Sequence, residues 1–235
     1  MNEFFSKKLI FIFYSIIKII IFSFLYYFNF LSFLSEDFKF SESYNKIKEF
    51  REQNLFLSIL IFFCLTIIWT FFLGFGSPIS ILSALIFEIK LGFIIALLSS
   101  SIGASIFYFF FKNITKHNIK NKIPSKYNRY ITLIDKNNFF YFLVLRMIPG
   151  IPFQVLNILP IVLNMKIYIF FIATVIGSSF SKFFIILISN EVFLNLSLNN
   201  SLTNIFLSSK FLIIIFLFLL FVLISIIIGK RFIHD

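Results

Sequence analysis

The stretch LRMIPGIPFQVLNILPIVLNMKIYIFFIATVIG, residues 145–177, decides the fold of this chain, and it places Arg146 inside apolar sequence. Three of the chain's five prolines lie in it: Pro149, Pro152 and Pro160. Proline removes a backbone donor and clashes with the preceding turn, so one continuous helix is not expected here. Broken backbone at membrane depth requires protein or a wet cavity around it. We therefore predict a re-entrant hairpin over residues 138–165, which turns at Pro149–Pro152 and leaves the membrane on the side where it entered.

A second copy of this pattern precedes it. A shift of 74 positions, without a gap, superposes three pairs of rare residues: Gly76 on Gly150, Pro78 on Pro152 and Gly103 on Gly177. These matches carry weight because the chain has only 7 glycines and 5 prolines. Internal repeats recur in transport folds. Each unit, 76–110 and 150–184, is predicted to be a hairpin followed by one crossing helix. The two units then have opposite orientation, and their hairpins meet near the middle of the membrane.

The composition excludes an ordinary water-soluble protein. The 235 residues are 60% hydrophobic with a mean hydropathy of +0.99, whereas soluble domains are about 45–50% apolar. We predict an all-α membrane protein, a polytopic helical bundle with two opposed re-entrant hairpins that form an inverted repeat. The predicted elements are five spans at 9–34, 55–73, 93–111, 167–190 and 211–229, and a first hairpin at 74–90 that turns at Gly76–Pro78.

Three regions follow from this pattern. Residues 1–53 hold the first span and a polar loop, 54–190 form the core with both hairpins, and 191–235 hold a loop and the last span. No cysteine framework or metal motif is visible, since Cys64 is the single cysteine. The sequence also lacks a Ser-His-Asp set and a glycine-rich phosphate loop. We therefore expect no cofactor and no enzymatic activity.

The net charge of +11 is concentrated in one loop. Residues 112–136 hold seven basic residues against one acid: Lys112, Lys116, Lys120, Lys122, Lys126, Arg129 and Lys136, with Asp135. In a membrane chain such loops stay cytoplasmic, so nucleic acid is not an expected partner. This rule places the C-terminus in the cytoplasm, and we expect the protein to lie in the plasma (inner) membrane. Five spans would put the N-terminus outside, and Lys7 and Lys8 argue against that.

Arg146 is the strongest functional signal. An arginine at the centre of a span costs about 2.5–3.5 kcal/mol on insertion scales, so it requires a partner, water or an anionic ligand. Its planar fork suits a phosphate headgroup. The alternative is a salt bridge or contacts with free carbonyls of the hairpin. Lys182, in the fourth span, either snorkels toward the membrane surface, which is the favoured expectation, or lines a wet path.

Other residues have two interpretations each. Glu88 is either part of the headgroup site, as the counter-charge of Arg146 or as a protonatable carboxylate, or an interfacial residue paired with Lys90. Asn157 either satisfies broken backbone groups or contacts the ligand with Arg146. The remaining candidates are structural: Gly76, Pro78, Pro149, Gly150, Pro152 and Pro160 shape the hairpins, and Gly103, Thr174 and Gly177 pack helices together.

Two motifs resemble the signature of the DedA/VTT-domain superfamily, and most of all its SNARE-associated Golgi protein branch with bacterial-type members. They are Arg146-x-x-Pro149-x-x-Pro152-Phe153-x-x-x-Asn157 and Phe170-x-x-x-Thr174-x-x-Gly177. The resemblance covers about residues 76–190. It implies two facing re-entrant hairpins, lipid scrambling or flipping of undecaprenyl phosphate or glycerophospholipids, and a functional role for Arg146. Glu88 stands where many members of this branch have glycine, and the acidic residues of bacterial DedA proteins are not evident, so proton coupling is not implied.

The sequence therefore predicts a lipid scramblase or flippase whose partners are membrane lipids with anionic headgroups; a homo-oligomer is compatible with it. Two alternatives remain open. One is a scaffold that organises membrane partners without transport, and the other is a proton-coupled small-ion transporter. An arginine in a wet cavity favours transport, whereas an arginine sealed against carbonyls favours the scaffold.

Overall fold

The fold comes from a computed structural model that describes residues 15, 40–74, 76–114, 138–148, 153–163, 165–198 and 200–234. Within these residues every regular element is an α-helix, which confirms the predicted class. The helices are α2 Phe40–Gln53, α3 Leu55–Phe72, α4 Gly76–Ile86, α5 Ile89–Ile114, α7 Asn138–Met147, α8 Phe153–Val162, α9 Ile167–Ser197, α10 Leu202–Leu207 and α11 Ser209–His234. The predicted first span and most of the basic loop lie outside the described residues.

Four described helices are long and apolar enough to cross a membrane: Leu55–Phe72, Ile89–Ile114, Ile167–Ser197 and Ser209–Gly229. Large apolar side chains are exposed along all four, including Phe56 on α3, Phe109 on α5, Phe180 on α9 and Phe216 on α11. Such side chains suit contact with lipid, since a helix that is apolar on all sides is typical of a membrane span. The chain is a multi-pass membrane protein.

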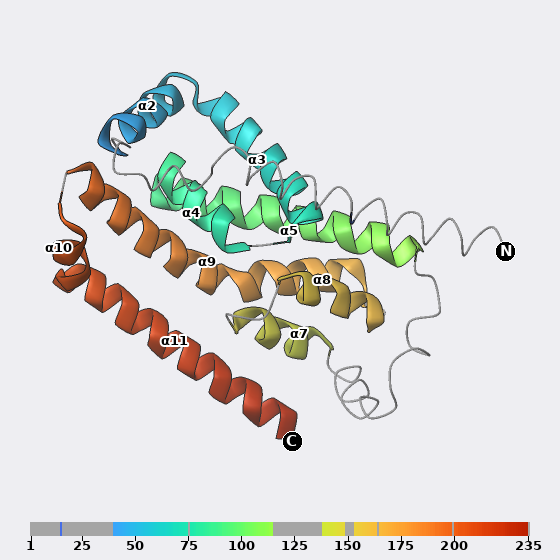
Figure 1. The fold of residues 1–235 in the computed structure, drawn as a ribbon. Helices are drawn as coiled ribbons and strands as arrows, with labels where there is room; N and C mark the ends of the chain where they lie inside the picture. Colours follow the sequence, from blue (N-terminus) through green and yellow to red (C-terminus); the bar gives the residue numbers. More distant parts are fainter. Residues whose placement is uncertain are drawn as a thin grey trace.

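The long helices α5 and α9 pack against each other and run in opposite directions through the centre of the bundle (Figure 1). Helix α3 runs parallel to α5: Phe62 joins Ile95 in one cluster, and Thr70 lies at Gly103 further along both helices. In the same way α7 runs parallel to α9. We call the first helix of each hairpin its first arm and the short helix that follows its second arm. Each long helix therefore packs along the first arm of its own unit, α5 along α3 and α9 along α7.

The second arms cross over. Helix α4 packs against α9, and α8 packs against α5. Ile79 and Ala84 of α4 share an apolar cluster with Ile186 of α9. The order first arm, short helix, long helix is repeated as α3–α4–α5 and α7–α8–α9, with the second set running in the opposite direction (Figure 1). The two units interlock, because each long helix contacts a short helix of the other.

In the first unit, the long helix and the first arm approach closely at a glycine. A Cβ on Gly103 would lie 2.9 Å from the Cβ of Thr70 and 3.0 Å from the carbonyl oxygen of Ile67. Real Cβ atoms essentially never come this close to other atoms without a shift. Glycine is therefore required at this contact.

The second unit has the same contact. A Cβ on Gly177 would lie 2.5 Å from the Cβ of Arg146 and 2.8 Å from the carbonyl oxygen of Leu143. The arm residues of the two units are 76 positions apart (146 − 70 and 143 − 67), whereas the glycines are 74 apart (177 − 103). The first unit therefore has two extra residues between its arm and its glycine. Arg146 occupies the position that Thr70 occupies in the first unit.

The first hairpin differs from its prediction. The sequence predicts a turn at Gly76–Pro78 after a full span, but these residues form the first turn of α4, where a proline without an N–H costs little. The turn lies at Gly74, whose φ is 70°, a conformation that favours glycine. Helices α3 and α4 thus form one helical hairpin, of which α3 is the first arm. The α3–α4 pair begins and ends at the same end of the bundle (Figure 1).

The second hairpin consists of α7 and α8. Residues 149–152, with the predicted turn residues Pro149, Gly150 and Pro152, lie outside the described residues. Pro160 is not at a turn but inside α8. The pairs α3–α4 and α7–α8 extend toward opposite ends of the bundle (Figure 1). Their re-entrant insertion into a membrane stays a prediction.

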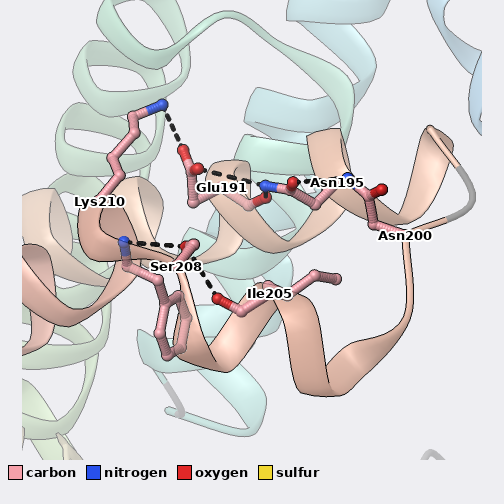
Figure 2. A network of polar contacts seen from close by, with 7 residues as sticks. Glu191, Asn195, Asn200, Ile205, Ser208 and Lys210 are labelled. Atoms are coloured by element: carbon pink, nitrogen blue, oxygen red, sulfur yellow. Dashed lines mark hydrogen bonds and ion pairs between the residues drawn. The ribbon is translucent and has the colours of Figure 1, made fainter.

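Polar contacts join α9, α10 and α11 at one end of the bundle (Figure 2). Glu191 forms an ion pair with Lys210, and the amide of Asn195 donates to the Glu191 carboxylate at 3.2 Å. The hydroxyl of Ser208 donates to the carbonyl of Ile205 at 2.9 Å and accepts from the N–H of Phe211 at 3.3 Å. These contacts set the bend from which α11 returns along α9.

Candidate functional site

Two apolar clusters lie at different depths along the central helices. The first contains Phe62, Ile79, Ala84, Phe87, Ile95, Ala96 and Ile186. The second contains Ala104, Tyr108, Phe142, Met165, Phe170 and Ala173. On α5 they are separated by residues 97–103, and on α9 by residues 174–185. The depth between the clusters is therefore a distinct layer in the middle of the bundle.

Polar side chains gather in that layer, and we call them the central polar layer. They are Thr70, Ser99, Ser100, Ser101, Arg146, Asn157, Thr174, Ser178 and Lys182, and none is more than 4% exposed. Soluble proteins seldom bury arginine and lysine, and membrane proteins do so mainly at functional sites. Each of the helices α3, α5, α7, α8 and α9 contributes at least one of these residues.

The hydroxyl groups of the layer mostly donate to their own helices. The bonds run from Ser99 to Ile95 O at 2.6 Å, Ser100 to Ala96 O at 2.6 Å, Thr174 to Phe170 O at 2.7 Å and Ser178 to Thr174 O at 2.7 Å. This pattern satisfies their protons in an apolar interior. Their oxygen lone pairs remain able to accept a bond from a ligand or water.

Arg146 leaves the last turn of α7 and extends toward α8. Its Nη2 donates to the Oδ1 of Asn157 at 2.6 Å and lies 3.5 Å from the carbonyl oxygen of Leu156. The guanidinium carbon lies 5.0 Å from the ring centre of Phe142 and 5.4 Å from that of Phe170. Aromatic faces attract cations at this range. The site thus orients the arginine from α8 on one side and holds it with two rings on the other.

Pro160 explains why a carbonyl is available to Arg146. In a regular helix the N–H of residue 160 would donate to the carbonyl of Leu156, four residues earlier, but proline has no N–H. Nη2 of Arg146 lies at that freed oxygen. Pro160, inside α8, therefore helps to position the arginine. From the sequence, we expected it only to shape the hairpin.

Lys182 lies at the middle of α9, with fifteen residues on each side (182 − 167 and 197 − 182). That distance is about 22 Å in a helix, far beyond the reach of a lysine. Its side chain is 4% exposed, and its Nζ has no hydrogen-bond partner among the described residues. The expectation that Lys182 snorkels is wrong, because the residue is too central.

Glu88 is not the counter-charge of Arg146. It lies at the junction of α4 and α5 with its side chain 84% exposed, and its Oε1 is 3.9 Å from the Nη1 of Arg51 on α2. The junction is at an end of the helices, whereas Arg146 is in the central polar layer. Glu88 therefore belongs to the surface of the bundle.

The remaining predicted residues are partly brought together. Asn157 contacts Arg146, Gly177 contacts the same residue, and Thr174 lies in the layer beside them. Sequence reasoning did not group Thr70 or the run Ser99–Ser101 with the site, because small residues in a span were interpreted as packing positions. What these residues share is a polar side chain at the same depth in the bundle, and this can be recognised only when the alignment of the helices is known.

Among the described residues no group of three or more His, Cys, Asp or Glu side chains could hold a metal ion. The family model described as the VTT domain matches residues 74–191, which is half of the chain. The match contains both short helices, all of α5, and α9 as far as residue 191. No solved structure matches the chain.

Proposed function

The chain belongs to the VTT-domain family, the domain of the DedA and SNARE-associated proteins, and on this premise we propose that it moves a phosphate-bearing lipid between the two leaflets of its membrane. The observation that carries the proposal is the position of Arg146: a guanidinium in a polar layer that apolar clusters close at both ends. A permanent charge at this depth is costly, and such charges mark substrate pathways.

The arrangement supports a path for a headgroup. A phosphate would accept hydrogen bonds from the bidentate fork of Arg146, while the acyl chains of the lipid stay in the surrounding membrane. The apolar cluster around Phe62 separates the layer from one end of the bundle, and the cluster around Phe170 separates it from the other. Movement of the hairpins at one end at a time would open the layer to one leaflet.

A scaffold is the second candidate, and one observation favours it. Nη2 of Arg146 lies at the carbonyl of Leu156 and bonds to Asn157, so the arginine also contributes to the structure of the second hairpin. A proton-coupled small-ion transporter is less well supported, because the described part of the central polar layer contains no carboxylate.

Reconstitution tests the proposal. Purified protein in liposomes is assayed for transfer of labelled phospholipid and of undecaprenyl phosphate. We expect Arg146→Lys to fold with a normal melting temperature and lose most transfer, since lysine offers a point charge where arginine offers a fork. The scaffold instead predicts that Arg146→Lys is close to normal and that Arg146→Ala melts early. Full transfer by a stably folded Arg146→Ala protein would refute the role of the arginine.

We also propose an inner-membrane location with a cytoplasmic C-terminus, from the basic residues of 112–136. Because α3–α4 returns to its own end, the crossings are the predicted helix at 9–34 together with α5, α9 and α11. An even number of crossings places the N-terminus in the cytoplasm as well. With a cytoplasmic N-terminus, Lys7 and Lys8 also follow the rule that basic segments stay on the cytoplasmic side. Five spans would have placed them outside.

A further inference from the structure

We infer that Lys182 is a second anion-binding residue of the central polar layer and that it binds, together with Arg146, one phosphate group. The inference rests on the proposed function and deepens it. It starts from a residue for which the fold supplies no hydrogen-bond partner among the described residues, although its ammonium group lies in the middle of the bundle.

Burial without a partner is unfavourable for this group. Moving an ammonium group out of water costs several kcal/mol unless hydrogen bonds and an opposite charge compensate it. The hydroxyls of Thr174 and Ser178, on the same helix, donate to backbone carbonyls, and no described oxygen lies within hydrogen-bond distance of the Nζ. The helices around Lys182 do not satisfy it.

The charged groups nearby do not neutralise it either. Glu191 is the nearest described carboxylate along α9, and Figure 2 shows it directed at Lys210 and Asn195. Arg146 bears a positive charge that acts on Lys182 through space. Two basic side chains therefore lie in the described part of the layer, and when both are charged they repel each other. An anion between them would relieve this repulsion.

The spacing fits one shared ligand. Gly177 contacts the Cβ of Arg146, and Lys182 is five residues further along α9, a rise of about 7.5 Å. From this contact the guanidinium extends toward Phe142 and Phe170, yet Arg146 and Lys182 still interact electrostatically, so a phosphate between the two groups would contact both. A phosphate has oxygen atoms on all sides, so it can accept the fork of Arg146 and the ammonium of Lys182 at once.

The test compares Lys182→Met and Lys182→Arg with Lys166→Met, a matched change at an exposed lysine next to the start of α9. Proteoliposomes report transfer of labelled phosphatidic acid and of labelled phosphatidylcholine, which share acyl chains but differ in headgroup charge. In detergent, the melting temperature is measured without ligand, with short-chain phosphatidic acid and with inorganic phosphate.

We expect Lys182→Met to melt at a higher temperature than wild type without ligand, because an uncompensated charge is gone. It should lose the stabilisation by phosphatidic acid, and its transfer of phosphatidic acid relative to phosphatidylcholine should fall about ten-fold. Lys182→Arg should retain both properties, and Lys166→Met should match wild type. A shift with inorganic phosphate as large as that with the lipid would identify free phosphate as the ligand.

Two results would overturn the inference. One is Lys182→Met with an unchanged lipid-induced shift and an unchanged transfer ratio. The other is early melting or failure to fold of Lys182→Met and Lys182→Gln alike, which would make Lys182 a structural residue. If wild type transfers neither lipid, the proposed function fails, but the melting shifts still decide whether Lys182 binds phosphate.

Discussion

Arg146 departs from α7 at the point where α7 touches Gly177 of α9, so closely that a Cβ on the glycine would lie 2.5 Å from the Cβ of the arginine. The contact fixes where the arginine side chain begins, and Asn157 fixes where it ends. Position and packing of the candidate site are therefore linked, and both can be tested by substitution.

The first prediction concerns this contact. Gly177→Ala should lower stability by about 1–3 kcal/mol, since the new methyl meets a backbone oxygen and a Cβ that cannot move aside. Gly103→Ala should cost less, with 2.9 Å to Thr70. Gly229→Ala is the control, because its nearest atom, at 3.1 Å, is the flexible end of Ile148. Equal melting temperatures for all three variants would contradict the close approach.

The second prediction separates transport from a scaffold. Asn157→Asp places a carboxylate at the 2.6 Å contact with Nη2 of Arg146 and creates a buried ion pair. We expect an equal or higher melting temperature and a strong loss of lipid transfer, since the arginine no longer favours an anionic ligand. Asn157→Gln serves as a neutral control. Normal transfer by Asn157→Asp would argue that Arg146 does not bind the headgroup.

The third prediction concerns Pro160. Pro160→Ala restores an N–H that can bond to the carbonyl of Leu156, and alanine is about 3 kcal/mol more favourable than proline inside a helix. We expect a more stable α8 and a weaker hold on Arg146, seen as a higher melting temperature with lower transfer. A variant that melts early would show that the proline is needed for the fold itself.

The fourth prediction concerns topology. After removal of the exposed Cys64, single cysteines at positions 7, 120 and 234 should all react with a membrane-impermeant reagent only from the cytoplasmic side. The reason is the even number of crossings that follows once α3 and α4 form one hairpin. Labelling of position 7 from outside, with 120 labelled from inside, would restore α3 as a full crossing.

The fifth prediction concerns the contacts in Figure 2. Lys210→Met removes the partner of the buried Glu191 carboxylate and should lower the melting temperature. The double variant with Glu191→Gln should recover most of the loss, because the charge is removed together with its partner. Transfer should stay near wild type in both variants, since the pair lies at the end of the bundle. A double variant as unstable as the single one would exclude this explanation.

Helical class and the repeat could be predicted from the sequence for a local reason. Long apolar runs have few structures that satisfy their backbone in lipid, and the rare Gly103 and Gly177 marked equivalent contacts in the two units. The first turn could not be predicted, because Gly74 and Gly76 lie two residues apart and either permits a turn. The structure selects Gly74, whose positive φ lets α4 begin with Gly76 and pack against α5 and α9.

By itself the sequence determined that this is a helical membrane protein with an inverted repeat and an arginine inside apolar sequence. Only the tertiary structure decided what surrounds that arginine. Thr70, Ser101 and Lys182 come from three different helices, and their depth in the bundle depends on how those helices align. Hydropathy is a property of each segment, whereas a polar layer between two apolar clusters exists only after the segments have packed.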